Sequence, residues 1–143
     1  MGEFSNFLSL YLQNFGFFDQ LVWLLGILAV LYQGWAWWNS REVKANRGPD
    51  FDEKFLQLKL GARFANLAID GLPLIGLLGT IAALLLTFAS MTDGVALGEI
   101  IPKFAPGLTS TCSGLLWAVV NLVFFNLLLQ PKLQEFSAIH DQD

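Results

Sequence analysis

Residues 72–91, LPLIGLLGTIAALLLTFASM, form a long run of consecutive positions without a charged side chain. At about 1.5 Å per residue, a helix of this length covers the roughly 30 Å hydrocarbon core of a bilayer. Two further uncharged stretches approach or exceed that length, residues 21–38, which residues 17 and 18 can extend, and residues 105–129. The sequence therefore predicts an all-α integral membrane protein with three transmembrane helices.

Composition and cysteine content narrow the functional classes. Hydrophobic residues make up 55% of the chain and charged residues only 14%, whereas soluble domains are richer in charge. A net charge of −4 without a basic cluster argues against a nucleic-acid-binding protein. Cys112 is the only cysteine, which excludes an intramolecular disulfide and favours a packed helix-face residue over a redox role. The first twenty residues lack Lys and Arg, so we expect no cleavable signal peptide.

The distribution of basic residues predicts the orientation in the membrane. Six of the eight lie between the first and second spans: Arg41, Lys44, Arg47, Lys54, Lys59 and Arg63. The positive-inside rule therefore places residues 39–66 in the cytoplasm. The N-terminus is then outside and the C-terminus in the cytoplasm.

These signals divide the chain into seven segments. They are an amphipathic helix on the outer membrane surface (1–16), transmembrane helix 1 (17–38), a short cytoplasmic loop and helix (39–66), transmembrane helix 2 (67–91), an outer, periplasmic loop (92–104), transmembrane helix 3 (105–130) and a cytoplasmic tail (131–143). Pro49 and Asp50 are typical of a helix start. Since no strong breaker precedes Pro73, we expect this helix to run directly into the second span.

Small and polar residues form a stripe on each of the two later spans. The stripes are Gly76, Thr80, Ala83, Thr87 and Ser90 on the second span, and Gly107, Thr111, Gly114, Ala118 and Asn121 on the third. Spacings of 4, 3, 4 and 3 place each set on one helical face. Either the stripes form a packing seam, or they line a cavity in which the hydroxyls of Thr80 and Thr111 bind water, an ion or an acidic side chain. The periodicity favours packing, although one stripe can serve both uses.

The depth of the two threonines and the supply of acids bear on the cavity hypothesis. Thr80 and Thr111 share a level only if the third span begins nearer Pro102 than Ala105. Asp70 is taken as the only acid close to a span, an interfacial carboxylate that is also a candidate for the ion path. No span offers Lys, Arg, Glu or His, so a partner must supply the carboxylate if the chain conducts protons.

Covalent catalysis is not indicated. Serines and threonines in the spans have no His, Lys or Asp base within plausible reach in the sequence. We therefore expect neither catalytic residues nor a metal site, and do not expect an enzyme. The transported ion would be the only small species involved.

The later spans resemble the MotA/TolQ/ExbB proton-channel family in the stretches PLIGLLGTIAALLLTF and PGLTSTCSGLLWAVVNLVFFN. The matching positions are Pro73, Gly76-Leu77-Leu78-Gly79-Thr80, Thr111, Gly114-Leu115 and Asn126. The resemblance implies a ring of five copies in the bacterial inner membrane, around two copies of a single-span partner of the MotB/TolR/ExbD kind. The partner's membrane aspartate would carry the proton, or sodium, and Thr80 and Thr111 match the pore-lining threonines. Ion flow would turn the inner helices and drive work in the cell envelope.

The chain also departs from the family pattern. The family usually has a glutamate near the place of Pro106 and a proline near residues 118–121, and this chain has neither. Residues 39–66 form a short cytoplasmic loop, which argues against flagellar torque generation and favours a minimal TolQ/ExbB-like subunit. The missing features also allow a homologue without conduction. A non-conducting scaffold or assembly subunit and a holin-like pore former therefore stay open as alternatives.

Overall fold

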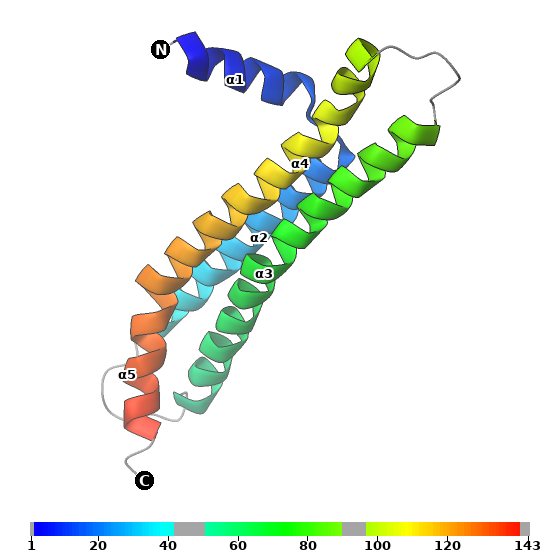
Figure 1. The fold of residues 1–143 in the computed structure, drawn as a ribbon. Helices are drawn as coiled ribbons and strands as arrows, with labels where there is room; N and C mark the ends of the chain where they lie inside the picture. Colours follow the sequence, from blue (N-terminus) through cyan, green and yellow to red (C-terminus); the bar gives the residue numbers. More distant parts are fainter. Residues whose placement is uncertain (1, 42–50, 90–96, 141–143) are drawn as a thin grey trace.

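The chain forms a bundle of long helices. The computed structural model describes residues 2–41, 51–89 and 97–140, and every element in these ranges is a helix (Figure 1). Three helices are long and apolar enough to cross a membrane: α2 (Phe17–Ser40), α3 (Phe51–Ala89) and the helical run from Pro102 to Ile139. The predicted all-α fold is therefore confirmed in the described ranges, with three helices whose length and composition suit membrane spans.

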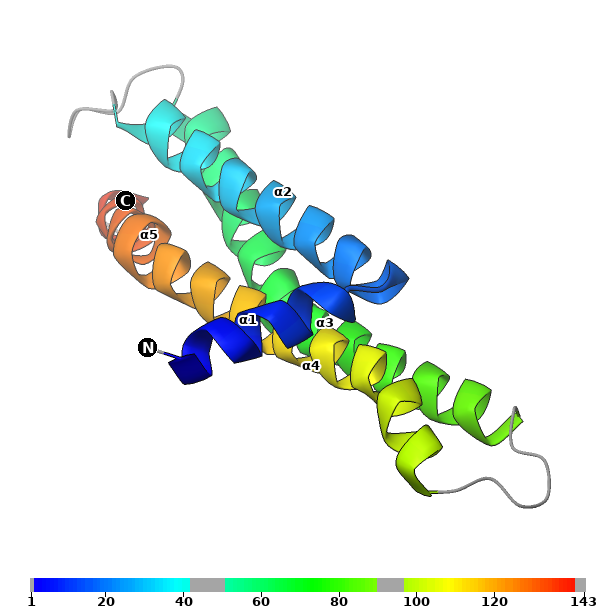
Figure 2. The same ribbon diagram turned by 90° about the horizontal axis from the view of Figure 1, so that it is seen from above.

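The first helix, α1 (Gly2–Gln13), lies outside this bundle. It lies near the start of α2 and passes over α4, and α3 and α4 both extend beyond the crossing, as the view from above shows (Figure 2). A short break at residues 14–16 separates it from α2. At this break, the backbone N–H of Gly16 donates to Asp19 Oδ2 at 3.0 Å, which holds the acid in the first turn of α2. A carboxylate at that position also complements the positive end of the helix dipole.

Helix α3 is continuous from the expected cytoplasmic segment into the second span. Its 39 residues correspond to about 58 Å, nearly twice the thickness of a hydrocarbon core. Pro73 lies inside the helix and does not end it. Pro49 and Asp50, proposed above as its start, lie outside the described residues, as does Ser90 at the end of the small-residue stripe.

The helix that contains the third apolar stretch begins before that stretch. Helix α4 (Leu97–Phe124) already includes part of the expected loop 92–104, and both Pro102 and Pro106 lie within it. A π-helical turn, η1 (Phe125–Leu129), follows, and α5 (Gln130–His140) continues the chain where a tail was expected. Proline at position 131 lacks a backbone N–H and would crowd the carbonyl one turn earlier, so the wider π turn accommodates it.

The long helices pack closely in pairs. Helices α3 and α4 lie side by side, and α2 packs against both (Figures 1 and 2). Close to the α1 end, the indole of Trp117 rests on Gly26, where an added Cβ would lie 2.4 Å from the ring. At the opposite end, an aromatic cluster formed by Phe51, Phe55 and Phe136 joins α5 to the start of α3.

Candidate functional site

The backbones of α3 and α4 approach each other through glycine. A Cβ added at Gly76 would lie 2.5 Å from the carbonyl oxygen of Ser110. A Cβ added at Gly114 would lie 2.5 Å from the carbonyl oxygen of Leu72. Because both obstacles are backbone atoms, no side-chain rotation could relieve either clash. These glycines therefore occupy a packing seam, one of the two uses that the stripe pattern allows.

The two stripe threonines meet at the edge of this seam. Their Oγ1 atoms lie 2.5 Å apart, and both side chains are half-buried. Thr80 Oγ1 also donates to the carbonyl of Gly107 at 2.7 Å, and Thr111 Oγ1 to that of Gly76 at 3.2 Å. Each hydroxyl has one hydrogen, so the pair satisfies two of these three contacts at a time and can exchange donors. The threonines therefore share a level, and α4 begins before Pro102.

The threonine pair lies on the side of the seam away from α2. Successive helical residues are rotated by about 100°, which separates the directions of Thr109, Ser110 and Thr111. Thr109 reaches Asp19 of α2, while Ser110 packs over Gly79, to which Phe18 of α2 is also close. Thr111 is one further step around the helix. Its hydroxyl and that of Thr80 are thus at the edge that α2 does not cover.

The neighbouring stripe residues extend the seam toward the far end of α3. A Cβ added at Gly107 would lie 2.8 Å from Cβ of Ala83. Thr87 is buried and donates to the carbonyl of Ala83 at 2.7 Å. Ala83 and Thr87, together with Leu86, Lys103 and Pro106, line a cavity of about 250 Å³ between the ends of α3 and α4.

Asn121 and Asp70 lie away from the threonine pair. Asn121 is fully buried on the α2 side of α4, where its Oδ1 accepts a hydrogen bond from Gln33 Nε2 at 2.7 Å. Asp70 is exposed on α3, ten residues before Thr80 and so about 15 Å from it along the helix. A role for either residue in an ion path stays a prediction. Asn126, matched to the family motif, is exposed in η1.

The expectation that Asp70 is the only acid close to a span is wrong. Asp19 lies in the first turn of α2 and is fully buried. Its Oδ1 accepts a hydrogen bond from Ser113 at 2.5 Å, and its Oδ2 lies 3.3 Å from Thr109 Oγ1. Both donors belong to α4, about ninety residues away in the sequence, so no local pattern could have identified them.

A chain of donors leads from α1 to this carboxylate. Trp23 Nε1 donates to the hydroxyl of Tyr11 at 2.9 Å, and that hydroxyl lies 2.5 Å from Ser113 Oγ. Because the Ser113 hydrogen is directed to Asp19, the Tyr11 hydroxyl must be the donor in its contact with Ser113. Hydrogen bonds aligned in this way strengthen one another. The chain therefore attaches α1 to both α2 and α4 through one buried acid.

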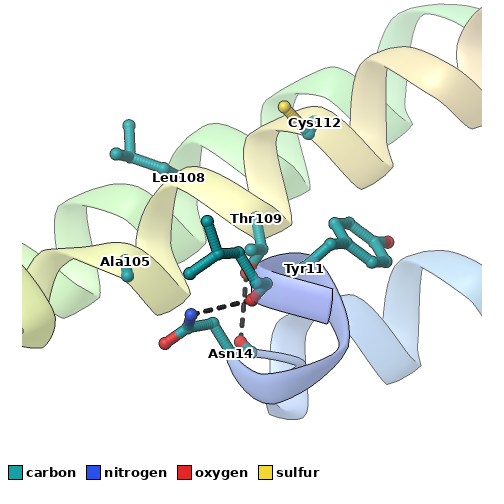
Figure 3. A pocket seen from close by; sticks show the side chains of 7 residues that line it. Tyr11, Asn14, Ala105, Leu108, Thr109 and Cys112 are labelled. Carbon is teal, nitrogen blue, oxygen red and sulfur yellow. Dashed lines mark hydrogen bonds between the residues drawn. The ribbon is translucent and has the colours of Figure 1, made fainter. Parts of the chain in front are cut away.

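A cavity of about 240 Å³ lies beside this junction, between α1 and α4 (Figure 3). Its lining consists of Leu10, Tyr11, Asn14, Ala105, Leu108, Thr109 and Cys112. Thr109 Oγ1 lies 3.1 Å from the carbonyl oxygen of Asn14, a contact that closes one wall. Cys112 is an exposed free cysteine on this wall.

Comparison with known proteins finds a family model and curated relatives that are named after a member of the same family. The model of the MotA/TolQ/ExbB proton channel family matches residues 40–140, more than half of the chain. The protein named biopolymer transport protein ExbB-like 2, from two strains of Helicobacter pylori, is 36% identical over 85 residues, 57% of this chain and 57% of that protein. ExbB-like 3 of a Synechocystis species is 35% identical over 74 residues, 49% of this chain and 35% of that protein. The chain thus spans about half the length of its curated relatives or less. No solved structure gives a significant match.

Proposed function

Because the chain belongs to the MotA/TolQ/ExbB proton channel family, we propose that it is an ion-channel subunit of a minimal TolQ/ExbB-like motor in the bacterial inner membrane. The N-terminus faces the periplasm and residues 39–66 the cytoplasm, as the distribution of basic residues indicates. The unit uses the proton motive force, or a sodium gradient, to do work in the cell envelope.

The observation that carries this proposal is the contact between the Thr80 and Thr111 hydroxyls. They lie 2.5 Å apart, half-buried, on the edge of the α3–α4 seam that α2 leaves uncovered. Hydroxyls within a membrane are costly unless they find hydrogen-bond partners. A pair of hydroxyls that can exchange the donor role can bind a carboxyl group in both its ionised and its protonated form.

The carboxylate of the proposed ion path comes from another protein. Asp19 of α2 contacts Thr109 and Ser113, on the other side of α4 from the threonine pair. We propose five copies of the chain around two copies of a single-span partner with a membrane aspartate. An ionised aspartate accepts charge-assisted hydrogen bonds from the threonine hydroxyls, and protonation removes the charge and weakens these bonds. Protonation would thus release the partner helix and allow it to turn relative to the ring.

The composition of the complex tests this proposal directly. The tagged protein is purified from the membranes of its own host in mild detergent, and native mass spectrometry gives the copy number of each component. Five copies with two of a single-span acidic protein are the expected result. A ring that contains no such protein would contradict the motor proposal.

Ion conduction provides the second test. In inverted vesicles of the host, Thr80→Val and Thr111→Val should abolish the proton flux that depends on the complex, while the same complex is recovered. Serine at either position keeps the hydroxyl and should retain flux. If valine and serine behave alike, the hydroxyls do not serve the ion.

One observation favours a second candidate, a non-conducting scaffold. Thr80 and Thr111 both find carbonyl acceptors within their own chain, and the glycines around them pack helix against helix. Under this alternative, the valine variants lower the yield of the intact complex instead of its flux. The same two variants therefore separate the candidates.

A further inference from the structure

We propose that Asp19 is a positioning residue, which fixes the turn of α4 that presents Thr111 to Thr80. The assignment goes beyond the family motif, which lies on α3 and α4, because Asp19 belongs to α2. Its consequence for ion conduction rests on the proposed function, whereas its geometric basis does not.

The carboxylate contacts α4 on both sides of Thr111 in sequence. Oδ1 accepts from Ser113 at 2.5 Å, and Oδ2 lies 3.3 Å from Thr109 Oγ1. Thr109 and Ser113 are four residues apart and therefore lie one above the other on the same helical face. Thr111 is midway between them and points to the other side of the helix. Two contacts one turn apart restrict both rotation and sliding of α4, and thereby set the level and direction of the Thr111 hydroxyl.

Asp19 is itself held firmly by α2. The Gly16 N–H donates to its Oδ2 at 3.0 Å, and the side chain is fully buried in the first turn of the helix. The Trp23–Tyr11 chain secures Ser113 from the side of α1. Each hydroxyl that faces Asp19 has a further acceptor on α4 itself, since Thr109 also reaches the carbonyl of Pro106 and Ser113 that of Thr109. The carboxylate thus competes with local bonds of α4 and sets which way these hydroxyls point.

Simple packing does not require an acid at this position. A buried carboxylate is costly unless it is fully hydrogen-bonded, and apolar side chains of similar size can fill the same space at lower cost. Both oxygens of Asp19 are used, by donors from Gly16 just before α2 and from α4. Directional bonds of this kind specify one arrangement of the helices, which is what alignment of the two threonine hydroxyls demands.

A disulfide between the two threonine positions reports the alignment directly. In a Cys112→Ala background, Thr80→Cys and Thr111→Cys place two thiols where oxygens now lie 2.5 Å apart. Native host membranes are oxidised with copper phenanthroline, and the remaining thiols are counted by a maleimide gel shift. We expect Asp19→Asn to slow disulfide formation about fivefold, the effect of losing roughly one hydrogen bond.

A second cysteine pair separates positioning from general loosening of the bundle. Ala36→Cys with Gly61→Cys joins α2 to α3 elsewhere, since a Cβ at Gly61 would lie 3.1 Å from Cβ of Ala36. Asp19→Asn should leave the rate of this pair unchanged, and Asp70→Asn should leave both rates unchanged. Equal slowing of both pairs, or of neither, would overturn the positioning role.

A second variant, Ser113→Ala, tests the same role without removing the acid. If Asp19→Asn does not accumulate in membranes, Ser113→Ala removes one donor while the acid stays, and it should slow only the Thr80–Thr111 pair. An unchanged rate in Ser113→Ala would then overturn the proposal. The cross-link forms without ion flow, so the two proposals can fail separately. If Asp19→Asn slows only the Thr80–Thr111 pair and the unsubstituted complex shows no proton flux, the proposed function is rejected and the positioning role stands.

Discussion

Gln33 of α2 donates from Nε2 to Oδ1 of Asn121 in α4 at 2.7 Å, and both side chains are fully buried. Asn121 is bonded on both sides, because its Nδ2 also donates to the carbonyl of Trp117 at 2.8 Å. Gln33 is not, since its Oε1 has no hydrogen-bond partner within the described residues. The two amides thus join α2 to α4 but contribute unequally.

We predict an asymmetric double-mutant cycle at this pair. Asn121→Leu leaves the whole Gln33 amide buried without a partner, and should lower the free energy of unfolding in detergent by about 2 kcal/mol. Gln33→Leu also removes the unpartnered Oε1 and should cost less. The double leucine variant should be less destabilised than Asn121→Leu alone, with a coupling of about 0.6 to 1.7 kcal/mol. Strictly additive effects in denaturant titrations would show that the bond contributes nothing.

The close packing of α3 and α4 predicts that alanine is destabilising at Gly114 but not at Gly71, which serves as the matched control. A Cβ at position 114 would meet the Leu72 carbonyl at 2.5 Å and Pro73 Cα at 3.1 Å, whereas nothing lies within 4 Å of a Cβ at Gly71. We expect Gly114→Ala to cost about 1 to 3 kcal/mol, because backbone atoms must move apart. Gly71→Ala should be neutral or slightly stabilising, since alanine favours a helix. Thermal unfolding in detergent measures both, and equal shifts would contradict the packing account.

The aromatic cluster at the other end predicts how α5 is held. The ring of Phe136 stacks on those of Phe51 and Phe55, with centroids 5.1 and 6.1 Å away, and is almost completely buried. Phe136→Ala should reduce the local stability of α5 by about 3 kcal/mol and speed its amide hydrogen exchange more than tenfold. The exposed Ser137→Ala on the same helix is the control. Exchange that stays slow in Phe136→Ala would show that α5 is held by other contacts.

The spans could be predicted from the sequence because the bilayer imposes a length and a polarity that are visible in one chain. The stripes could also be predicted, since helical periodicity places Gly76 and Thr80 on one face whatever helix packs against it. The sequence could not predict which edge of each stripe lies next to α2 and which edge α2 leaves uncovered. This depends on the position of α2, and only the structure shows that Thr109 reaches α2 while Thr111 points away from it.

Two features were missed for identifiable reasons. Pro102 fell within the expected loop 92–104, yet α4 begins at Leu97 and passes through it. Asp19 was overlooked because it lies at the edge of an apolar run, and its partners Thr109 and Ser113 are distant in sequence. A polar residue within or directly beside an apolar span is a pattern that could have identified Asp19. Gln33 shows the same pattern.

The attachment of α1 gives the last prediction. The Tyr11 hydroxyl accepts from Trp23 and donates to Ser113, so Tyr11→Phe removes two hydrogen bonds while the ring stays. We expect hydrogen exchange in α1 to quicken about tenfold or more, as for a loss of roughly 1.5 to 2 kcal/mol, with little change in α3. Tyr32→Phe is the matched control, because Tyr32 contacts Trp35 and Phe64 through its ring. If both variants leave exchange in α1 unchanged, then apolar contacts alone hold this helix against α4, and the donor chain to Asp19 does not anchor it.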